Sequence, residues 1–123
     1  MKKILVIDDE TIVRTSCERT LTPEGYEVIS TSGGQEGIEY LQNQSFELVL
    51  LDLKMPDIDG MEILARINKE WSDTKVIMIT GYSTVDTAVQ ALRYGAYNFI
   101  EKPFTPDSLL NAVKEVFDGS TDE

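Results

Sequence analysis

The stretch LVLLDLKMPDIDG, residues 48–60, decides the fold of this chain. Four apolar residues run directly into Asp52, and a turn containing proline, glycine and two further aspartates follows. A short continuous apolar run is typical of a parallel strand that is covered on both faces. A carboxylate at the end of such a strand is costly to desolvate unless a cation or hydrogen bonds compensate it. The rest of the sequence must therefore supply a partner for Asp52.

Five short apolar runs, rich in valine and isoleucine, alternate with segments of helical periodicity. The runs are KILVI (3–7), YEVIS (26–30), ELVLL (47–51), KVIMIT (75–80) and YNFI (97–100). The helical stripes are Val13, Cys17 and Leu21; Met61, Leu64, Ile67 and Trp71; Val85, Ala88, Val89 and Leu92; and Leu109, Val113 and Val116. A weaker helix is predicted over 34–43. This alternation predicts a doubly wound α/β fold, with helices on both faces of a five-stranded parallel sheet.

Turn and capping residues agree with these helix boundaries. Ser83, followed three residues later by Asp86, resembles a capping box at the start of the third-named stripe. Gly95 follows that stripe at the position of a helix-ending glycine, and Pro106 occupies the first turn of the last helix.

Length and composition indicate one soluble domain. We expect this domain to cover residues 1–118, with 119–123 as a tail or the stub of a linker. No apolar run reaches the ~20 residues that a membrane helix needs. The amino terminus does not resemble a signal peptide, and the single Cys17 fits a reducing compartment, so we expect a cytoplasmic protein. The formal net charge of −11 argues against direct binding to nucleic acid.

Polar side chains follow four of the five predicted strands. They are Asp8, Asp9 and Glu10 after the first, Asp52 at the end of the third, Thr80 at the end of the fourth, and Lys102 after the fifth. The carboxyl ends of parallel strands meet at one edge of an open sheet, so these groups should converge there. Clustered carboxylates repel one another, and Lys102 supplies one positive charge. The remaining negative charge fits a hard divalent cation such as Mg²⁺, which prefers oxygen ligands.

These groups together suit the formation of an aspartyl phosphate on Asp52. Aspartate is a known covalent phosphoryl acceptor, and such a transfer depends on positioning and charge neutralisation. Each residue has a plainer interpretation when it is taken alone: Asp8 and Asp9 as the start of a helix, Thr80 as a strand-end hydroxyl, and Lys102 as a surface lysine. Their joint placement favours the phosphoryl site.

Four segments resemble the receiver domain of bacterial two-component response regulators. They are ILVIDDE (4–10), LVLLDLKMPDIDGMEIL (48–64), VIMITGY (76–82) and GAYNFIEKPF (95–104). The resemblance covers essentially the whole chain, and residues 78–104 look most like receivers joined to AAA+ transcription activators of the NtrC class. It implies a CheY-like sheet with strand order 2-1-3-4-5. It also implies a signalling module, not a classical enzyme, that takes a phosphoryl group from a sensor histidine kinase and catalyses its own phosphotransfer and slow dephosphorylation.

The resemblance also implies roles for individual residues at the acidic site. Asp52 would be the phosphoacceptor. Asp9, Asp52 and the backbone carbonyl of Lys54 would bind Mg²⁺ directly, and Asp8 would act through water. Lys102 would pair with the phosphoryl group.

A second set of implied roles concerns the switch. Thr80 would contact the phosphoryl group after transfer. Phe99 stands where the family keeps its switch aromatic, although a tyrosine is commoner there. The Lys102–Pro103 bond matches one that the family often holds in the cis form. An output domain, a partner protein or a second copy of the chain is expected to bind a face formed by roughly residues 83–117.

Three alternative functions are less well supported. An aspartate-dependent phosphatase usually has a second carboxylate two residues after its nucleophile, and that residue is Lys54 here. A flavin-binding electron carrier needs a hydroxyl- and glycine-rich loop after the first strand, where this chain has DDETIV (8–13). An inactive receiver used as a scaffold would not need the complete acidic set. The chain has no histidine, which excludes Ser-His and Cys-His nucleophile pairs and histidine metal ligands.

Three nearby residues receive no chemical role. Asp57 and Asp59 are interpreted as turn formers in PDIDG. Trp71 is expected on the core face of a helix.

Overall fold

The computed structural model describes residues 1–81 and 84–118. Its elements are β1 (Lys3–Ile7), α1 (Thr11–Leu21), the 3₁₀ helix η1 (Thr22–Glu24), β2 (Glu27–Thr31), α2 (Gly34–Asn43), β3 (Leu48–Asp52), α3 (Gly60–Glu70), β4 (Lys75–Thr80), α4 (Val85–Arg93), β5 (Asn98–Glu101) and α5 (Pro106–Asp118). Every predicted strand lies within one residue of the observed strand, and the helix predicted over 34–43 is α2. The predicted tail, 119–123, lies outside the described residues.

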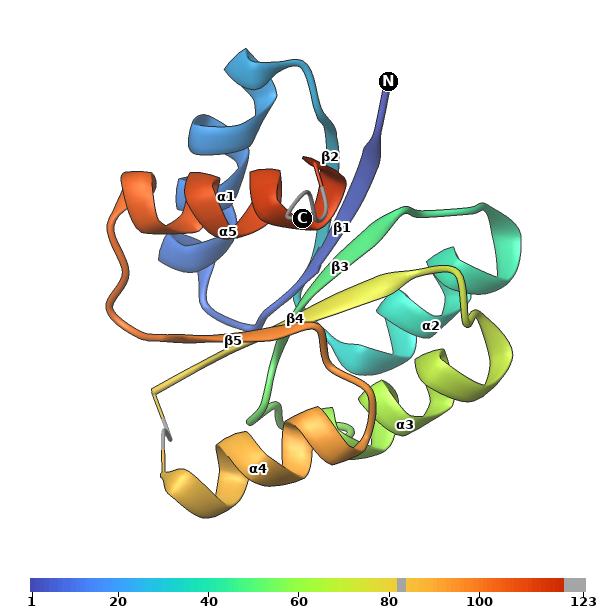
Figure 1. The fold of residues 1–123 in the computed structure, drawn as a ribbon. Coiled ribbons are helices and arrows are strands. Elements are labelled where there is room, and N and C mark those ends of the chain that lie inside the picture. Colours follow the sequence, from blue (N-terminus) through green and yellow to red (C-terminus); the bar gives the residue numbers. More distant parts are fainter. Residues whose placement is uncertain (82–83, 119–123) are drawn as a thin grey trace.

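The five strands form one parallel sheet in the order β2-β1-β3-β4-β5. Helices α1 and α5 cover one face of the sheet, and α2, α3 and α4 lie on the other (Figure 1). This confirms the predicted doubly wound fold and its strand order. The direction of winding reverses between β1 and β3, so the topological switch point lies where these two strands end.

The central strands place alternate side chains into two apolar cores. Ile4, Val6 and Leu50 pack on the side of α1 and α5, whereas Leu5 and Val49 pack on the side of α2 and α3. All five residues of β3 are buried, as the opening stretch predicted for a strand covered on both faces. Burial of these aliphatic side chains is the main source of stability.

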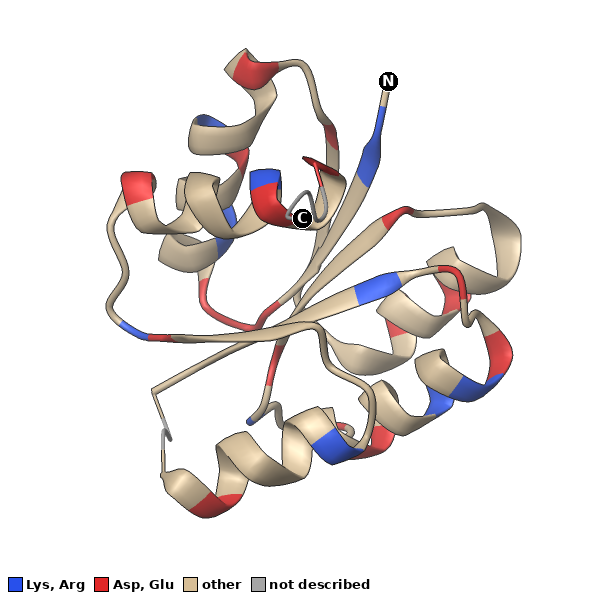
Figure 2. Cartoon of the chain, viewed as in Figure 1, with Lys and Arg blue, Asp and Glu red and all other residues tan. Residues whose placement is uncertain are grey.

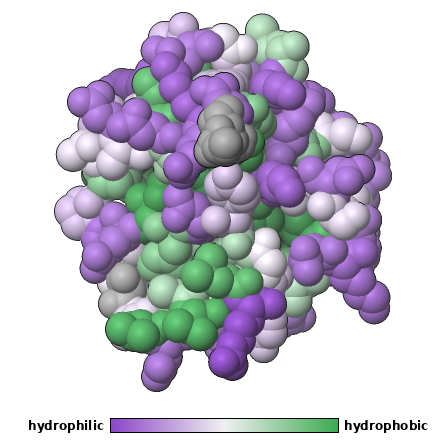
Figure 3. All heavy atoms as spheres, viewed as in Figure 1, coloured by the Kyte–Doolittle hydropathy of each residue, from purple (hydrophilic) through white to green (hydrophobic). Residues whose placement is uncertain are grey.

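The apolar stripe of α4 is packed differently from the stripes of α1 and α3. The predicted stripe residues Val85, Ala88, Val89 and Leu92 do lie on a helix. Val85 is 79% exposed and Leu92 55%, and Ala91 is the buried residue of this helix, all of which the structure describes. An apolar surface therefore lies over α4, near the bottom of the view in Figure 3. The physical reason is that α4 lies beside β5, a short edge strand that offers little surface to cover.

The helix ends show which capping predictions hold. Ser83 lies outside the described residues, and the capping box of α4 is formed by Thr84 and Thr87. Gly95 follows α4 with a φ of 102°, a left-handed conformation that glycine adopts easily, as predicted. Pro106 begins α5, and Trp71 ends α3 half-buried against the core. Among the described residues, no helix has the length and apolar character needed to span a membrane.

Candidate functional site

The strand ends bring three carboxylates together at one edge of the sheet. Asp8 and Asp9 follow β1, and Asp52 ends β3, which pairs directly with β1. One oxygen atom from each carboxylate lies within 4.8 Å of the other two. Asp8 is 1% exposed and Asp52 is 4% exposed, whereas Asp9 is open to solvent. Figure 2 shows acidic residues at the carboxyl ends of the neighbouring strands β1 and β3.

Lys102 supplies the cation that the buried Asp52 requires. Its Nζ lies 3.6 Å from Asp52 Oδ2, 3.0 Å from Asp8 Oδ2 and 2.6 Å from Glu10 Oε1. The end of β5 positions this side chain, because the Lys102 backbone N–H donates a hydrogen bond to the Thr80 carbonyl oxygen at 2.8 Å. The Lys102–Pro103 peptide bond is cis, as the resemblance implied.

Burial perturbs the acidity of this site. Desolvation and the neighbouring Asp8 carboxylate together raise the pKa of Asp52 to about 6, against the opposing effect of Lys102. Desolvation also raises the pKa of Asp8, although the Glu10 backbone N–H partly offsets it. Burial alone would lower the pKa of Lys102, but its close contacts with the Glu10 and Asp8 carboxylates reverse that effect and raise it. Ionised carboxylates are therefore held here at a cost in stability.

The residues at this edge fit a hard divalent cation. Asp8 Oδ2 is buried and accepts no hydrogen bond of good geometry from the described residues, even though Lys102 Nζ is 3.0 Å away. The Lys102 ammonium contacts the carboxylates of Asp8, Glu10 and Asp52, so one positive charge faces three negative ones. Carboxylate oxygens are the ligands that Mg²⁺ prefers. Asp8, Asp9 and Asp52 are the described carboxylates that lie close enough together to hold one ion, and the family resemblance adds the Lys54 carbonyl as an expected ligand.

The two predicted switch residues lie on the neighbouring strands. Thr80 ends β4 and is fully buried. Phe99 lies in β5 opposite Met78 of β4, and it packs half-buried against the core on the side of α2 and α3. Thr80 and Phe99 therefore lie on adjoining strands of the sheet.

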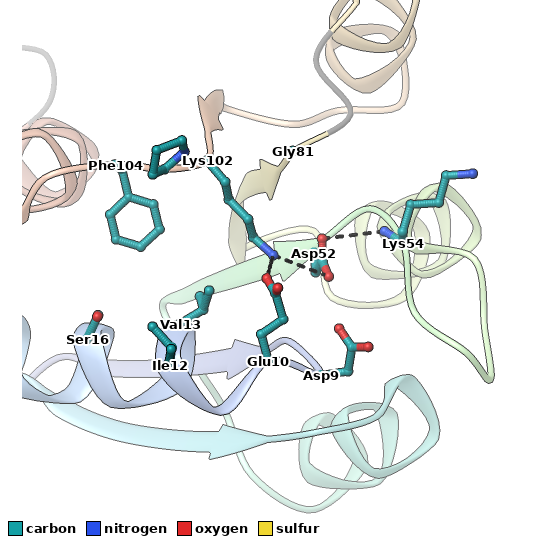
Figure 4. Close-up of a pocket in the computed structure, with 11 residues that line it drawn as sticks. Asp9, Glu10, Ile12, Val13, Ser16, Asp52, Lys54, Gly81, Lys102 and Phe104 are labelled. Carbon is teal, nitrogen blue, oxygen red and sulfur yellow. Dashed lines mark hydrogen bonds and ion pairs between the residues drawn. The ribbon is translucent and has the colours of Figure 1, made fainter.

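An open pocket of about 630 Å³ lies over the acidic edge. Glu10, Asp52 and Lys102 line one part of it, and Ile12 and Phe104 line another (Figure 4). The Lys54 side chain points away from the carboxylates in this view, while its backbone N–H donates to Asp52 Oδ1 at 3.4 Å. This position leaves the backbone of Lys54, not its ammonium, at the acidic site.

Three acidic residues to which the sequence analysis gave no individual role make specific contacts in the structure. Glu10 makes the shortest ion pair with Lys102, and an acidic triplet at a strand end was the available signal. Asp59 is the N-cap of α3 and accepts a hydrogen bond from the Met61 backbone N–H. Asp57 accepts hydrogen bonds from the first turn of α2, far from it in sequence. The interpretation of Asp57 and Asp59 as simple turn formers is therefore incomplete.

The chain matches one protein family, and curated members of it, over most of its length. A model of the response regulator receiver domain matches residues 4–114. A probable transcriptional regulator, ycf27, from Porphyridium aerugineum is 40% identical over 115 residues, which are 94% of this chain and 48% of that protein. The C4-dicarboxylate transport transcriptional regulatory protein DctD from Pseudomonas aeruginosa is 38% identical over 117 residues, which are 94% of this chain and 25% of that protein. The chain thus spans about half the length of the first relative and a quarter of the second.

Solved structures resemble the chain along nearly its full length. A CheY-like response regulator receiver domain protein from Methanospirillum hungatei JF-1 superposes with a TM-score of 0.92 and 39% identity, over 96% of this chain and 94% of that one. The response regulator protein TrrA from Thermotoga maritima, solved in complex with Mg(2+)-BeF, superposes with a TM-score of 0.84 and 34% identity, over 94% and 99% of the two chains.

Proposed function

Because the chain belongs to the family of response regulator receiver domains, we propose that Asp52 accepts a phosphoryl group and so switches the molecule between two states. As a receiver domain, the chain is a signalling module of a two-component system and not a classical enzyme. The observation that supports Asp52 as the acceptor is its placement as a buried carboxylate beside two others and 3.6 Å from the Lys102 ammonium.

The proposed chemistry is an in-line transfer from a phosphohistidine of a sensor histidine kinase. An Asp52 carboxylate oxygen attacks phosphorus, so an O–P bond forms while the P–N bond to the imidazole breaks. Lys102 neutralises charge on the phosphoryl oxygens, and the Thr80 hydroxyl donates a hydrogen bond to one of them. Bound Mg²⁺ supplies further charge neutralisation. Attack by water on the same acyl phosphate accounts for slow dephosphorylation.

The proposed switch begins with the movement of Thr80 toward the phosphoryl group. Phosphorylation adds about two negative charges and new acceptor oxygens next to the end of β4. The shift of Thr80 leaves space beside β5, into which the half-buried Phe99 rotates. Helix α4 then moves, because it buries little of its own surface against the sheet. The phosphoryl group shifts the population between two packings by the difference in its contacts with each.

The proposed output face comprises α4, β5 and α5, within residues 83–117, of which residue 83 is outside the described part. The exposed apolar residues Val85, Val89, Leu92 and Tyr97 lie on this segment. Exposed apolar surface of this kind marks contact sites for protein partners. The named transcriptional regulators among the relatives favour an output domain that controls transcription, reached through this face or through a second copy of the chain.

The test of the acceptor is phosphorylation with acetyl phosphate, followed by mapping of the modified residue. We expect one phosphoryl group on Asp52, formed with Mg²⁺ and not with EDTA. Asp52→Asn should remain unmodified. Asp73→Asn, which removes a carboxylate from the loop between α3 and β4, should still be phosphorylated on Asp52. Modification of Asp52→Asn to the same extent as the unchanged protein would disprove the assignment.

The test of the metal site is the thermal stability of the unphosphorylated protein. A ligand that binds the native state raises stability by mass action. Mg²⁺ should therefore raise the unfolding temperature, and Asp9→Ala should remove most of that rise. An equal rise in Asp9→Ala would place the ion elsewhere.

A further inference from the structure

Asp57 connects the loop after β3 to the start of α2. Its Oδ1 accepts a hydrogen bond from the Gly34 backbone N–H at 3.1 Å, and its Oδ2 accepts one from the Gln35 N–H at 3.0 Å. Oδ1 also accepts the Ile58 N–H at 2.9 Å, within its own loop. One exposed side chain thereby joins two segments that lie 22 and 23 residues apart in sequence.

The start of α2 is built to receive this carboxylate. Its N-cap is Gly33, which has no side chain and so cannot accept hydrogen bonds from the first helical turn. A Cβ atom at Gly33 would lie 3.2 Å from Asp57 Oδ2. A Cβ at Gly34 would lie 2.5 Å from Ile63 Cδ1 and 3.2 Å from Ile58 Cβ. The two glycines therefore let the loop approach closely, and Asp57 provides the cap that α2 lacks.

The loop that Asp57 holds is the one that carries the acceptor site. It begins at Asp52, contains Lys54 and ends at α3. Its far end is fixed by the Gly60 N–H, which donates to the Leu53 carbonyl oxygen at 2.9 Å, and by Asp59 as the cap of α3. At the start of the loop, the hydrogen bond that the Lys54 backbone N–H donates to Asp52 Oδ1 is long, at 3.4 Å. Met55 and Ile58 pack against the core, and Asp57 adds the polar contact that ties the middle of the loop to the backbone of α2.

Asp57 is suited to this role because it stays ionised. Hydrogen bonds from the Gln35 and Gly34 backbone N–H groups lower its pKa. A carboxylate also interacts favourably with the positive end of the α2 dipole.

We propose that Asp57 is a positioning residue for the divalent-cation site, because it anchors the β3–α3 loop to α2 and so holds the Lys54 backbone beside Asp52. This inference rests on the proposed function, because it takes the Lys54 carbonyl as a ligand of the Mg²⁺ that the proposed phosphoryl transfer requires. Groups that orient metal ligands commonly change metal affinity tenfold or more when they are removed. The same link makes the start of α2 respond to the cation.

The experiment is a Mg²⁺ titration of the unphosphorylated protein, followed by amide NMR. For Asp57→Ala we expect the affinity for Mg²⁺ to fall by about tenfold. Asp57→Asn loses the same charge but keeps the Oδ1 acceptor for Gly34 and Ile58, so its affinity should lie between those of Asp57→Ala and the unchanged protein. Asp73→Ala removes a carboxylate from the loop between α3 and β4, at the amino ends of the strands and so on the far side of the sheet from the site. It should leave the affinity for Mg²⁺ within about twofold of that of the unchanged protein.

The spectra provide a readout that a general loss of stability would not imitate. In the unchanged protein, the Gly34 and Gln35 amide signals should shift as Mg²⁺ binds, and in Asp57→Ala they should not. If the unchanged protein binds no Mg²⁺, the proposed metal site itself fails. If it binds Mg²⁺ and Asp57→Ala binds equally well, Asp57 has no positioning role. If Asp57→Asn and Asp57→Ala weaken Mg²⁺ binding equally, the effect comes from the lost charge, and the proposal is overturned. If Asp57→Ala does not fold, Asp57→Asn is compared with the unchanged protein instead.

Discussion

Helices α3 and α4 cover the same face of the sheet, yet they are held very differently. Helix α3 buries Met61, Ile63, Leu64 and Ile67, and Asp59 caps its first turn. Helix α4 buries Ala91 and exposes most of its apolar stripe. The sequence patterns of the two helices are similar, so the difference comes from the strands beneath them. Helix α3 lies against the interior of the sheet, whereas α4 lies beside the edge strand β5 (Figure 1).

This difference matches what a switch requires. The loop that follows Asp52 leads into the firmly packed α3, so the acceptor site keeps its geometry. The segment that follows Thr80 leads into α4, whose apolar residues are mostly exposed, so we expect α4 to move at a smaller cost than α3. Elements that move in signalling are drawn from the least stable parts of a fold. Matched changes in α3 and α4 test whether the two helices differ in how firmly they are packed and how easily they move.

The largest expected effect is on global stability, from matched leucine truncations in the two helices. Leu64 is fully buried, so Leu64→Ala should lower the free energy of unfolding by about 3 kcal/mol. Leu92 is 55% exposed, so Leu92→Ala should change it by less than about 0.5 kcal/mol. Urea unfolding monitored by circular dichroism measures both. A loss in Leu92→Ala comparable to that in Leu64→Ala would mean that α4 is packed as firmly as α3.

A second prediction concerns the cost of keeping the acceptor buried and ionised. The folded pKa of Asp52, about 6, lies above the ordinary value of 3.8. The folded protein favours the protonated Asp52 carboxyl, so this group stabilises the fold fully at a pH below its unfolded pKa. That stabilisation is lost as the pH rises through the folded pKa. In Mg²⁺-free buffer, Asp52→Asn should therefore be more stable than the unchanged protein at pH 7, by on the order of 2 kcal/mol.

The pH dependence identifies the cause of that gain. The advantage of Asp52→Asn should shrink as the pH falls from 7 through about 6 toward 3.8, because the carboxyl of the unchanged protein becomes protonated. Urea unfolding at a series of pH values measures it. Asp107→Asn, in the first turn of α5, is a control that should show no such gain. A gain that persists undiminished at low pH would point to packing and not to charge.

The third prediction concerns where activation is felt. With beryllofluoride as a phosphoryl analogue, amide exchange should change by about tenfold or more in residues 85–101 and little in α3, residues 60–70. Thr80→Ala should still bind the analogue but should lose the change in α4, because the link from the acceptor to β4 is removed. Hydrogen exchange with mass spectrometry measures both regions. A response confined to α1 and α2 would place the output surface elsewhere.

The same contrast shows which features the sequence could predict. Each strand and the meeting of Asp8, Asp9, Asp52 and Lys102 follow from local apolar runs and from the shared carboxyl end of parallel strands. The strand order came from the family resemblance and not from these runs. The orientation of α4 does not follow from local patterns either, because helical spacing shows which residues share a face but not whether sheet lies beneath that face. The Glu10–Lys102 pair and the capping of α2 by Asp57 join residues 92 and 22–23 positions apart. Such contacts depend on side-chain direction, for which no local pattern exists.

The smallest expected effect comes from the cap of α4. The Thr84 hydroxyl accepts a hydrogen bond from the Thr87 N–H at 3.1 Å, and the Thr87 hydroxyl accepts one from the Thr84 N–H at 3.0 Å. Removing such a cap costs about 1 kcal/mol of helix stability. Since α4 buries little apolar surface, we expect it to open separately from the core, so Thr84→Ala should leave the global unfolding free energy nearly unchanged and should speed amide exchange in residues 85–93 several-fold. The matching change in α3, Asp59→Ala, should lower global stability by about 1 kcal/mol instead, because α3 unfolds with the core. If both variants lower global stability equally, α4 is part of the cooperative core, and its exposed stripe reflects only the shape of the sheet edge and not freedom to move.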